Sequence, residues 1–303
     1  MRATSQHNPT KLHNIQRFLP AAALALAAGC AASGGATDGS DGSKAADDGV
    51  ISLLDPAGDD RGPGTYVYPS DQVYLPGSFD LRQLEVEPKG NTVEFRVTVD
   101  RRIEDPWDSK AWGGNGFSIQ MAFIHIDKDR ADGSGHTTGM PGTNVRFAAN
   151  EAWDKVVIIS PQGPTRVNSE VEAKASEMQA DVVVPTLTRA SGRTLVAVVN
   201  TADLGGAPEP GWGYQVLMQS NEGFPAKTDL LTRKVNEFEG QHRFGGGTDY
   251  DVDPHVLDIL AGDASGDEGE AELQYEALRA YNAEATEPSA ENQATVPMIY
   301  PAS

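Results

Sequence analysis

The chain has 303 residues, with 44 acidic against 24 basic side chains, a net charge of −20 and one cysteine. So acidic a surface repels nucleic-acid backbones and anionic lipid headgroups, which excludes nucleic acid as a partner and favours neutral polysaccharides or cations. The single cysteine excludes an internal disulfide, so the fold depends on its hydrophobic core.

Residues 1–29 have the composition of a lipoprotein signal peptide. Three basic residues and no acidic one precede the apolar run LPAAALALAAGC, which is too short to remain as a membrane-spanning helix. The run ends in Ala-Ala-Gly-Cys, which resembles a lipobox although Leu26 lies one position early. We therefore expect diacylation of Cys30 and export to the cell envelope, at the outer membrane or cell surface, with a lipid anchor in the membrane.

Composition divides the remainder of the chain into three parts. Residues 30–49 consist mainly of Gly, Ser, Ala and Asp, which is typical of a flexible tether. Residues 50–262 hold nearly all the large apolar residues and all four tryptophans, which predicts one folded domain. Residues 263–303 are acidic again, and we expect a mostly disordered tail with one short helix within residues 268–285.

The central domain shows the patterns of β-strands. Residues 93–99 alternate apolar and polar side chains, as a half-buried antiparallel strand does, and residues 117–126 begin in the same way. Further β-rich runs are KVVIIS, ADVVVP, TLVAVVN and WGYQVLMQS, each bounded by turn residues. No amphipathic helix of 12 residues interrupts them, which argues against βαβ units. The sequence predicts an all-β fold, an antiparallel β-sandwich.

Four segments, in this order, resemble one known family. They are DPAGDDRGPGTYVYPSD with the following LPGSFDL, DPWDSKAWGGNGFSIQMAFIHID, MPGTNVRFAANEAWDKVVII and FGGGTDYDVDPHVLDIL. Together they are similar to the glucodextranase C-terminal-like module, a β-sandwich appended to glucodextranases, pullulanases and other α-glucan enzymes. The resemblance covers residues 55–260. It implies a glucodextranase C-terminal or DOMON-like sandwich associated with carbohydrate binding, and no hydrolase, because the catalytic domains of those enzymes have no counterpart.

Three acidic loops are candidate Ca²⁺ sites, because carboxylates and turn carbonyls are the ligands that this hard cation prefers. The first loop is the best candidate, since its acidic residues lie where the chain matches the family most closely. The middle loop resembles an EF-hand, but its third Asp comes one residue late and Thr138 occupies the twelfth position. The candidate ligands are Asp55, Asp59, Asp60 and Asp80 in the first region and Asp127, Asp129 and Asp132 in the middle loop. The third loop holds Asp249, Asp251 and Asp253. The alternative for each loop is a solvated turn.

Aromatic side chains are the candidates for sugar contact, because pyranose faces stack on aromatic rings. Trp112 lies in a loop, in residues that are additional to the family pattern, and Trp107 in the same loop matches the pattern. Exposed rings on an edge segment are expected from Tyr66 and Tyr68, with Tyr74 beside them. Trp153 and Trp212 precede strands and are expected in the core.

We expect a non-catalytic, lipid-anchored envelope protein that binds polysaccharide, with an α-glucan as the first candidate ligand. No nucleophile elbow, His-Glu-x-x-His or phosphate loop is present. Two alternatives remain open. One is a structural or docking protein with envelope protein partners and no affinity for sugar. The other is a haem-binding electron carrier with axial ligands among Met121, His125, His136 and Met140. His125 is otherwise expected at a strand edge with its hydrogen bonds satisfied.

Overall fold

A computed structural model describes residues 49–267 and 269–301 of the protein. The signal peptide, Cys30 and all of the tether except Gly49 lie outside these residues. Among the described helices, none is long and apolar enough to cross a membrane.

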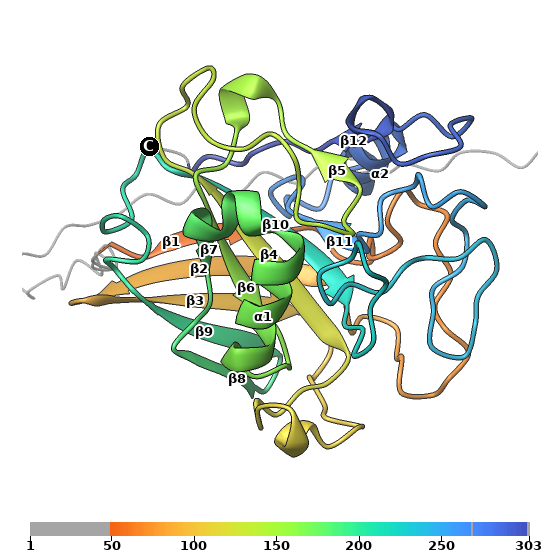
Figure 1. The fold of residues 1–303 in the computed structure, drawn as a ribbon, viewed down its shortest axis with the longest axis horizontal. Coiled ribbons are helices and arrows are strands. Elements are labelled where there is room, and N and C mark those ends of the chain that lie inside the picture. The colour runs from red at the N-terminus through yellow and green to blue at the C-terminus, as the bar shows by residue number, and fades with distance from the viewer. Residues whose placement is uncertain (1–48, 268, 302–303) are drawn as a thin grey trace, which may run out of the picture. The chain divides into compact units, whose positions relative to one another are not determined.

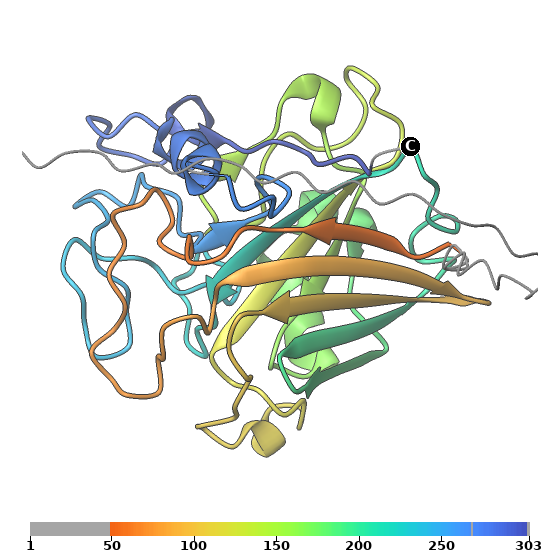
Figure 2. The ribbon, with the colours of Figure 1, turned by 180° about the vertical axis from the view of Figure 1, so that it is seen from behind.

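Two five-stranded sheets face each other and form a β-sandwich, as the sequence predicts (Figures 1 and 2). The first sheet has the order β1 (Ile51–Leu54), β2 (Leu81–Lys89), β3 (Thr92–Val99), β9 (Thr194–Asn200), β8 (Leu187–Ser191), and it is antiparallel throughout. The second has the order β11 (Asp258–Ile259), β10 (Gly213–Ser220), β4 (Gln120–Asp127), β6 (Lys155–Ile159), β7 (Val182–Val183). A small parallel pair joins β5 (Val145–Arg146) to β12 (Ala294–Thr295).

The first core lies between the two sheets. Strand β3 contributes every second residue to it, which explains the alternating pattern in the sequence. Val93, Phe95, Val97 and Val99 are fully buried against the second sheet. The side chains between them point outward, because successive strand residues face opposite sides of a sheet. There Arg96 pairs with Glu85 (3.1 Å) and Glu87 (2.5 Å) on the neighbouring strand β2 and with Glu94 (2.8 Å) on β3 itself.

The second sheet is covered on both faces, so its strands lose the two-residue period. In β4, Ala122, Ile124 and Ile126 belong to the first core, whereas Met121 and Phe123 belong to a second core on the outer face. Every residue of β4 and β10 is buried. Continuous burial explains why the predicted alternation of residues 117–126 does not persist along the strand.

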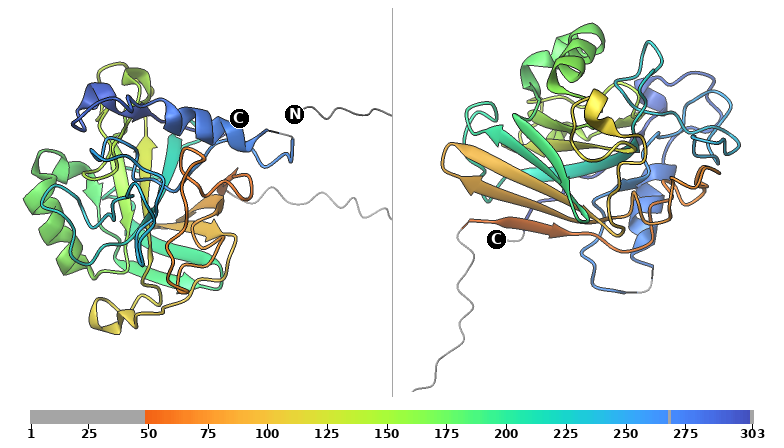
Figure 3. Two further views of the ribbon diagram at one scale, coloured as in Figure 1. Left: turned by 90° about the vertical axis from the view of Figure 1, so that its right-hand side faces the viewer. Right: turned by 90° about the horizontal axis from the view of Figure 1, so that it is seen from below.

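A helix that the sequence analysis missed covers part of the outer face (Figure 3). α1 (Pro164–Lys174) starts with proline at its first turn and places Val167 and Val171 in the second core. It connects β6 to β7, which pair in parallel. The expectation that βαβ units are absent is therefore wrong at this point. Short 3₁₀ turns occur at η1 (Ser109–Ala111), η2 (Ala149–Glu151), η3 (Ser176–Asp181) and η4 (Ala290–Asn292).

The C-terminal segment packs on the sandwich. The predicted short helix is present as α2 (Ala271–Arg279), and its Leu278 is buried in the second core together with Val296 and Met298. Beyond β12, the backbone of Ile299 exchanges two hydrogen bonds with Tyr214 (2.8 and 2.9 Å). The expectation of a mostly disordered tail does not describe residues 269–301, because their few apolar side chains complete the second core.

Candidate functional site

Two long loop segments lie side by side at one end of the sandwich, residues 55–80 and 221–257 (Figure 1). Val67 and Gly245 exchange backbone hydrogen bonds (3.0 and 2.9 Å). Beneath them is a third apolar cluster that includes Tyr66, Phe79 and Phe244. This cluster fixes the loops that carry the candidate site residues.

Trp107 and Trp112 lie together, both half-buried, in the loop of residues 105–116. Their ring centroids are 6.5 Å apart, with the planes inclined by 57°. The loop is closed by Asp105, whose carboxylate accepts hydrogen bonds from the backbone N–H of Ser109 (2.9 Å) and from its hydroxyl (2.8 Å). This turn contains η1. It brings the two indoles, which are five residues apart in the sequence, onto one surface.

Polar groups surround the inner indole. His242 lies edge-on to Trp107 at 5.7 Å between ring centroids, and its side chain is 41% exposed. The guanidinium of Arg233 lies 5.6 Å from the centre of the Trp107 ring. Tyr74 packs against the same indole at 6.0 Å. We call Trp107, Trp112, His242 and Tyr74 the aromatic patch. It combines ring faces with nitrogen donors, the combination that sugar recognition uses.

The three tyrosines differ from the expected exposed row. Tyr66 is only 1% exposed, and its hydroxyl donates to the Asp253 carboxylate (3.1 Å) and to the Pro254 carbonyl. Tyr68 is half-buried against Phe244, and its hydroxyl donates to Asp60. Tyr74 is 3% exposed and supports Trp107 from within. The expectation of an exposed Tyr66 is wrong, because the third apolar cluster requires its ring.

Four aspartates from distant parts of the chain converge where β1, β2 and β11 meet. Asp55 directly follows β1, Asp59 lies in the next loop, Asp80 directly precedes β2, and Asp258 opens β11. Ligand atoms of Asp55, Asp59 and Asp258 all lie within 4.8 Å of one another, and Asp80 lies beside this group without being part of it. Asp55, Asp59 and Asp258 are 0% exposed and Asp80 is 4% exposed. We call these four residues the carboxylate cage.

Burial perturbs the ionisation of the cage. It raises the pKa of Asp59 to about 7 and that of Asp80 to about 7, against an ordinary value of 3.8. Burial, with repulsion between the carboxylates, also raises the pKa of Asp55 and of Asp258 well above that value. The nearby cation is Arg82, whose Nε lies 4.0 Å from Asp80 Oδ1. One guanidinium does not balance four buried carboxylates.

The other predicted acidic loops are satisfied by protein donors. Asp127 Oδ1 accepts the backbone N–H groups of Asp129 (3.1 Å) and Arg130 (3.0 Å), and its Oδ2 accepts the hydroxyl of Tyr300. Asp154, which the sequence analysis did not select, joins Asp127 and Asp129 in a cluster and accepts the Lys128 N–H (2.7 Å). Asp132 is outside that cluster.

The aspartates of the third loop also have hydrogen-bond or ion-pair partners within the protein. Asp253 Oδ1 accepts the backbone N–H (2.9 Å) and hydroxyl (2.7 Å) of Thr248, and Asp251 pairs with Lys234 (2.7 Å). In the first region, Asp60 also has a protein donor, because its Oδ2 accepts a hydrogen bond from the Tyr68 hydroxyl. It is therefore not counted in the carboxylate cage.

The comparison with known families decides where the chain belongs. The sequence model of the family described as the C-terminal binding-module, SLH-like, of glucodextranase matches residues 50–296. The chain belongs to this family. No curated protein matches the chain. The matched range includes α2 and β12, so the binding module extends past residue 262, as the packing of this segment on the second core indicates.

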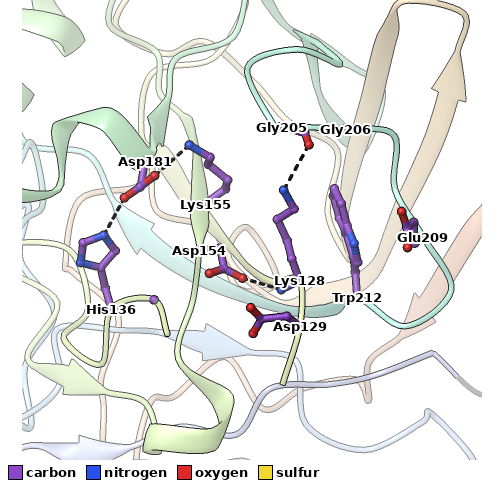
Figure 4. Close-up of a pocket in the computed structure, with 11 residues that line it drawn as sticks. Lys128, Asp129, His136, Asp154, Lys155, Asp181, Gly205, Gly206, Glu209 and Trp212 are labelled. Carbon is purple, nitrogen blue, oxygen red and sulfur yellow. Dashed lines mark hydrogen bonds and ion pairs between the residues drawn. The ribbon is translucent and has the colours of Figure 1, made fainter. Parts of the chain in front are cut away.

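The module also has a surface cleft of about 650 Å³ that the sequence analysis did not identify (Figure 4). Lys128 lies along the Trp212 ring, with its Nζ 5.0 Å from the ring centre, and donates to the Leu204 carbonyl (3.0 Å). On the opposite side, Asp181 bridges His136 (2.9 Å) and Lys155 (2.8 Å). Trp212 is 3% exposed and Trp153 is fully buried, so both are core residues as predicted.

Other residues could not be selected from sequence. Asp258 stands in a quoted family motif, but nothing in its spacing shows that it meets Asp55. Phe224 (95% exposed), Phe238 (70%) and Tyr250 (57%) are exposed aromatics of the 221–257 loop segment that carry no motif. The residues named for haem ligation are packed in other ways. Met121, His125 and Met140 are buried, and the Trp153 ring packs against both His125 (5.3 Å) and His136 (4.4 Å).

Proposed function

We propose that the module is non-catalytic and binds neutral polysaccharide at the aromatic patch, with an α-glucan as the first candidate. The observation that carries the proposal is the pair of half-buried indoles, Trp107 and Trp112, 6.5 Å apart in one loop of a chain that belongs to a binding-module family. The C–H groups of a pyranose stack on such rings, and its hydroxyls accept hydrogen bonds from donors at the rim.

The immediate surroundings fit this ligand class. His242, whose side chain is 41% exposed, provides ring nitrogens beside Trp107, and the largely buried Arg233 supports the patch by donating to the Tyr74 hydroxyl (2.9 Å) and the His242 carbonyl (2.6 Å). A hollow of about 240 Å³ opens next to the patch, lined among others by Arg102, Glu104 and Pro106. A neutral polymer also avoids the electrostatic repulsion that the net charge of −20 imposes on anionic glycans.

Affinity electrophoresis of the full-length protein in starch, pullulan and dextran gels tests the proposal. Retardation is expected in at least one gel, and Trp112→Ala should weaken binding by about 1–3 kcal/mol because the outer ring face is lost. Leu273→Ala, which removes a 53% exposed apolar side chain on α2, is the control and should leave migration unchanged.

Free migration of the wild-type protein on every glycan would favour the alternative, a structural or docking protein of the envelope. Retardation that is equally strong in Trp112→Ala would place sugar binding elsewhere on the module, with the cleft beside Trp212 as the next surface to test.

We propose further that the protein is exported and anchored to the envelope by lipid on Cys30. The Ala-Ala-Gly-Cys sequence at the end of the apolar run supports this, and the SLH-like character of the family fits an envelope location. Metabolic labelling with an alkynyl fatty acid should mark the wild-type protein and leave Cys30→Ser unlabelled. Equal labelling of both proteins would rule out Cys30 as the acceptor.

A further inference from the structure

We propose that the carboxylate cage is a structural binding site for one Ca²⁺ ion, with Asp55, Asp59 and Asp258 as its clustered ligands and Asp80 beside them. The site is separate from the aromatic patch, and its test does not depend on sugar binding.

Three of the carboxylates are held in place by backbone N–H groups. Asp55 Oδ1 accepts from Ala261 (2.8 Å), Asp80 Oδ2 from Gly58 (2.7 Å) and Asp258 Oδ2 from Leu81 (2.7 Å). Each therefore uses one oxygen to fix its orientation. The second oxygen of each carboxylate is buried and has no hydrogen-bond partner among residues 49–267 and 269–301; these atoms are Asp55 Oδ2, Asp80 Oδ1 and Asp258 Oδ1.

Asp59 completes the set, because both of its carboxylate oxygens are buried and have no hydrogen-bond partner in the described part of the chain. Its position is fixed from the backbone side. The Asp59 carbonyl accepts from the side chain of Gln274 on α2, which also accepts the Ile259 N–H (2.8 Å). The cage therefore presents five free carboxylate oxygens that cannot reach water, and such groups cost several kcal/mol each unless an ion or proton compensates them.

The comparison with the other acidic clusters shows that this deficit is particular to the cage. The carboxylates of Asp127, Asp154 and Asp253 accept backbone or side-chain donors. None of their oxygens is among the buried atoms that lack a partner within the described part of the chain. Elsewhere in the described part of the chain, the buried carboxylate oxygens without a hydrogen-bond partner are Asp229 Oδ2 and Glu170 Oε2, and each lies near a lysine, Lys234 at 4.0 Å and Lys174 at 2.6 Å. The cage differs because its unpartnered oxygens lie together.

The donor set selects the kind of ion. All the free ligands are carboxylate oxygens, which suit hard cations, whereas Zn²⁺ sites are built mainly with thiolates or imidazoles. Ca²⁺ takes six to eight oxygens in a flexible arrangement, so the four free oxygens of Asp55, Asp59 and Asp258 and two to four further oxygens from Asp80, backbone or water would complete its shell. Mg²⁺ requires a near-ideal octahedron and retains more of its water, which fits a buried cage less well.

A cation at this place would connect segments that are far apart in the sequence. Asp55 and Asp80 belong to the β1–β2 edge of the first sheet, and Asp258 belongs to β11 at the edge of the second. The ion would therefore join the two sheets at one edge. A protein without disulfides gains a cross-link between its layers in this way.

Calorimetry with CaCl₂ and thermal unfolding of the full-length protein test the proposal. We expect one Ca²⁺ per chain and a melting temperature about 5–10 °C higher at saturating Ca²⁺ than in EDTA. Asp59→Asn and Asp258→Asn should each weaken binding at least tenfold. Asp129→Asn, an equal loss of charge in the middle loop, should bind like the wild type.

A second measurement separates lost binding from lost folding. In EDTA the Asp59→Asn protein should melt at or above the wild-type temperature, because the substitution relieves repulsion within the cage. Absence of both binding heat and a Ca²⁺-dependent melting shift in the wild-type protein would overturn the proposal. So would undiminished Ca²⁺ affinity in Asp59→Asn and Asp258→Asn.

Discussion

His125 shows how the environment of one side chain departs from what its sequence neighbours suggest. The surrounding residues predict a strand-edge histidine with satisfied ring nitrogens. In the structure, β4 is an inner strand, and the imidazole is 0% exposed against Phe147 (4.8 Å) and Trp153 (5.3 Å). Both ring nitrogens lack a hydrogen-bond partner within the described residues. The neutral ring is therefore required, because a buried imidazolium would have no counter-charge.

This burial makes the stability of the fold depend on pH through His125. Burial lowers the pKa of His125 from 6.5 to about 3. Below about pH 6.5 the unfolded chain therefore binds a proton that the folded chain does not, and stability is lost as the pH falls. Between about pH 7 and pH 5 this residue alone should reduce the free energy of unfolding by about 2 kcal/mol.

Urea denaturation of the wild type and of His125→Leu at several pH values measures this contribution. Leucine fills a similar space and does not titrate, so the stability of the variant relative to the wild type should increase by that amount on acidification. The difference between the two proteins isolates His125 from the many carboxylates. Parallel pH curves would show that the histidine is protonated, or accessible, in the folded state.

Residue chemistry could be read from the sequence only where partners are close along the chain. The closeness of Asp55 and Asp59 is visible in the sequence, because they lie four residues apart in the first acidic loop. Asp258 joins them only through the pairing of β11 with β10, about 200 residues later, and no local pattern records that pairing. The sequence around Tyr66 predicts an exposed ring, because the burial of Tyr66 depends on contacts with the distant 221–257 loop segment.

Among the secondary-structure elements, the strands with one face in water have the clearest sequence pattern. β3 was found from its alternation because one of its faces carries charged pairs in water, whereas β4 and β10, buried on both faces, had no clean period. α1 was missed because its apolar stripe consists of only Val167 and Val171. The ion pairs of Glu170 with Arg166 and Lys174 (both 2.6 Å), each four residues away, were the available signal.

At the level of the whole molecule, composition gave a misleading boundary after residue 262. The acidic character of the last segment suggested a disordered tail, since most of its residues do face water. Its few apolar side chains are nevertheless placed where the second core needs them, on α2 and around β12. The family match extends to residue 296 and so includes α2 and β12, and the packing continues to Met298. The second sheet thus depends on α1 and on the C-terminal segment to cover its outer face.

Deletion of residues 263–303 should consequently destroy cooperative folding. It removes the buried side chains of Leu278, Val296 and Met298, each contributing about 1.5–3 kcal/mol, and the sum approaches the whole stability of a typical domain. Point variants grade the effect: Leu278→Ala should cost about 2–5 kcal/mol in urea denaturation, whereas Leu273→Ala, whose side chain is 53% exposed, should change stability by less than about 0.5 kcal/mol. A truncated protein that unfolds cooperatively at the wild-type urea midpoint would mean that the segment only rests on the sandwich, as its composition suggests.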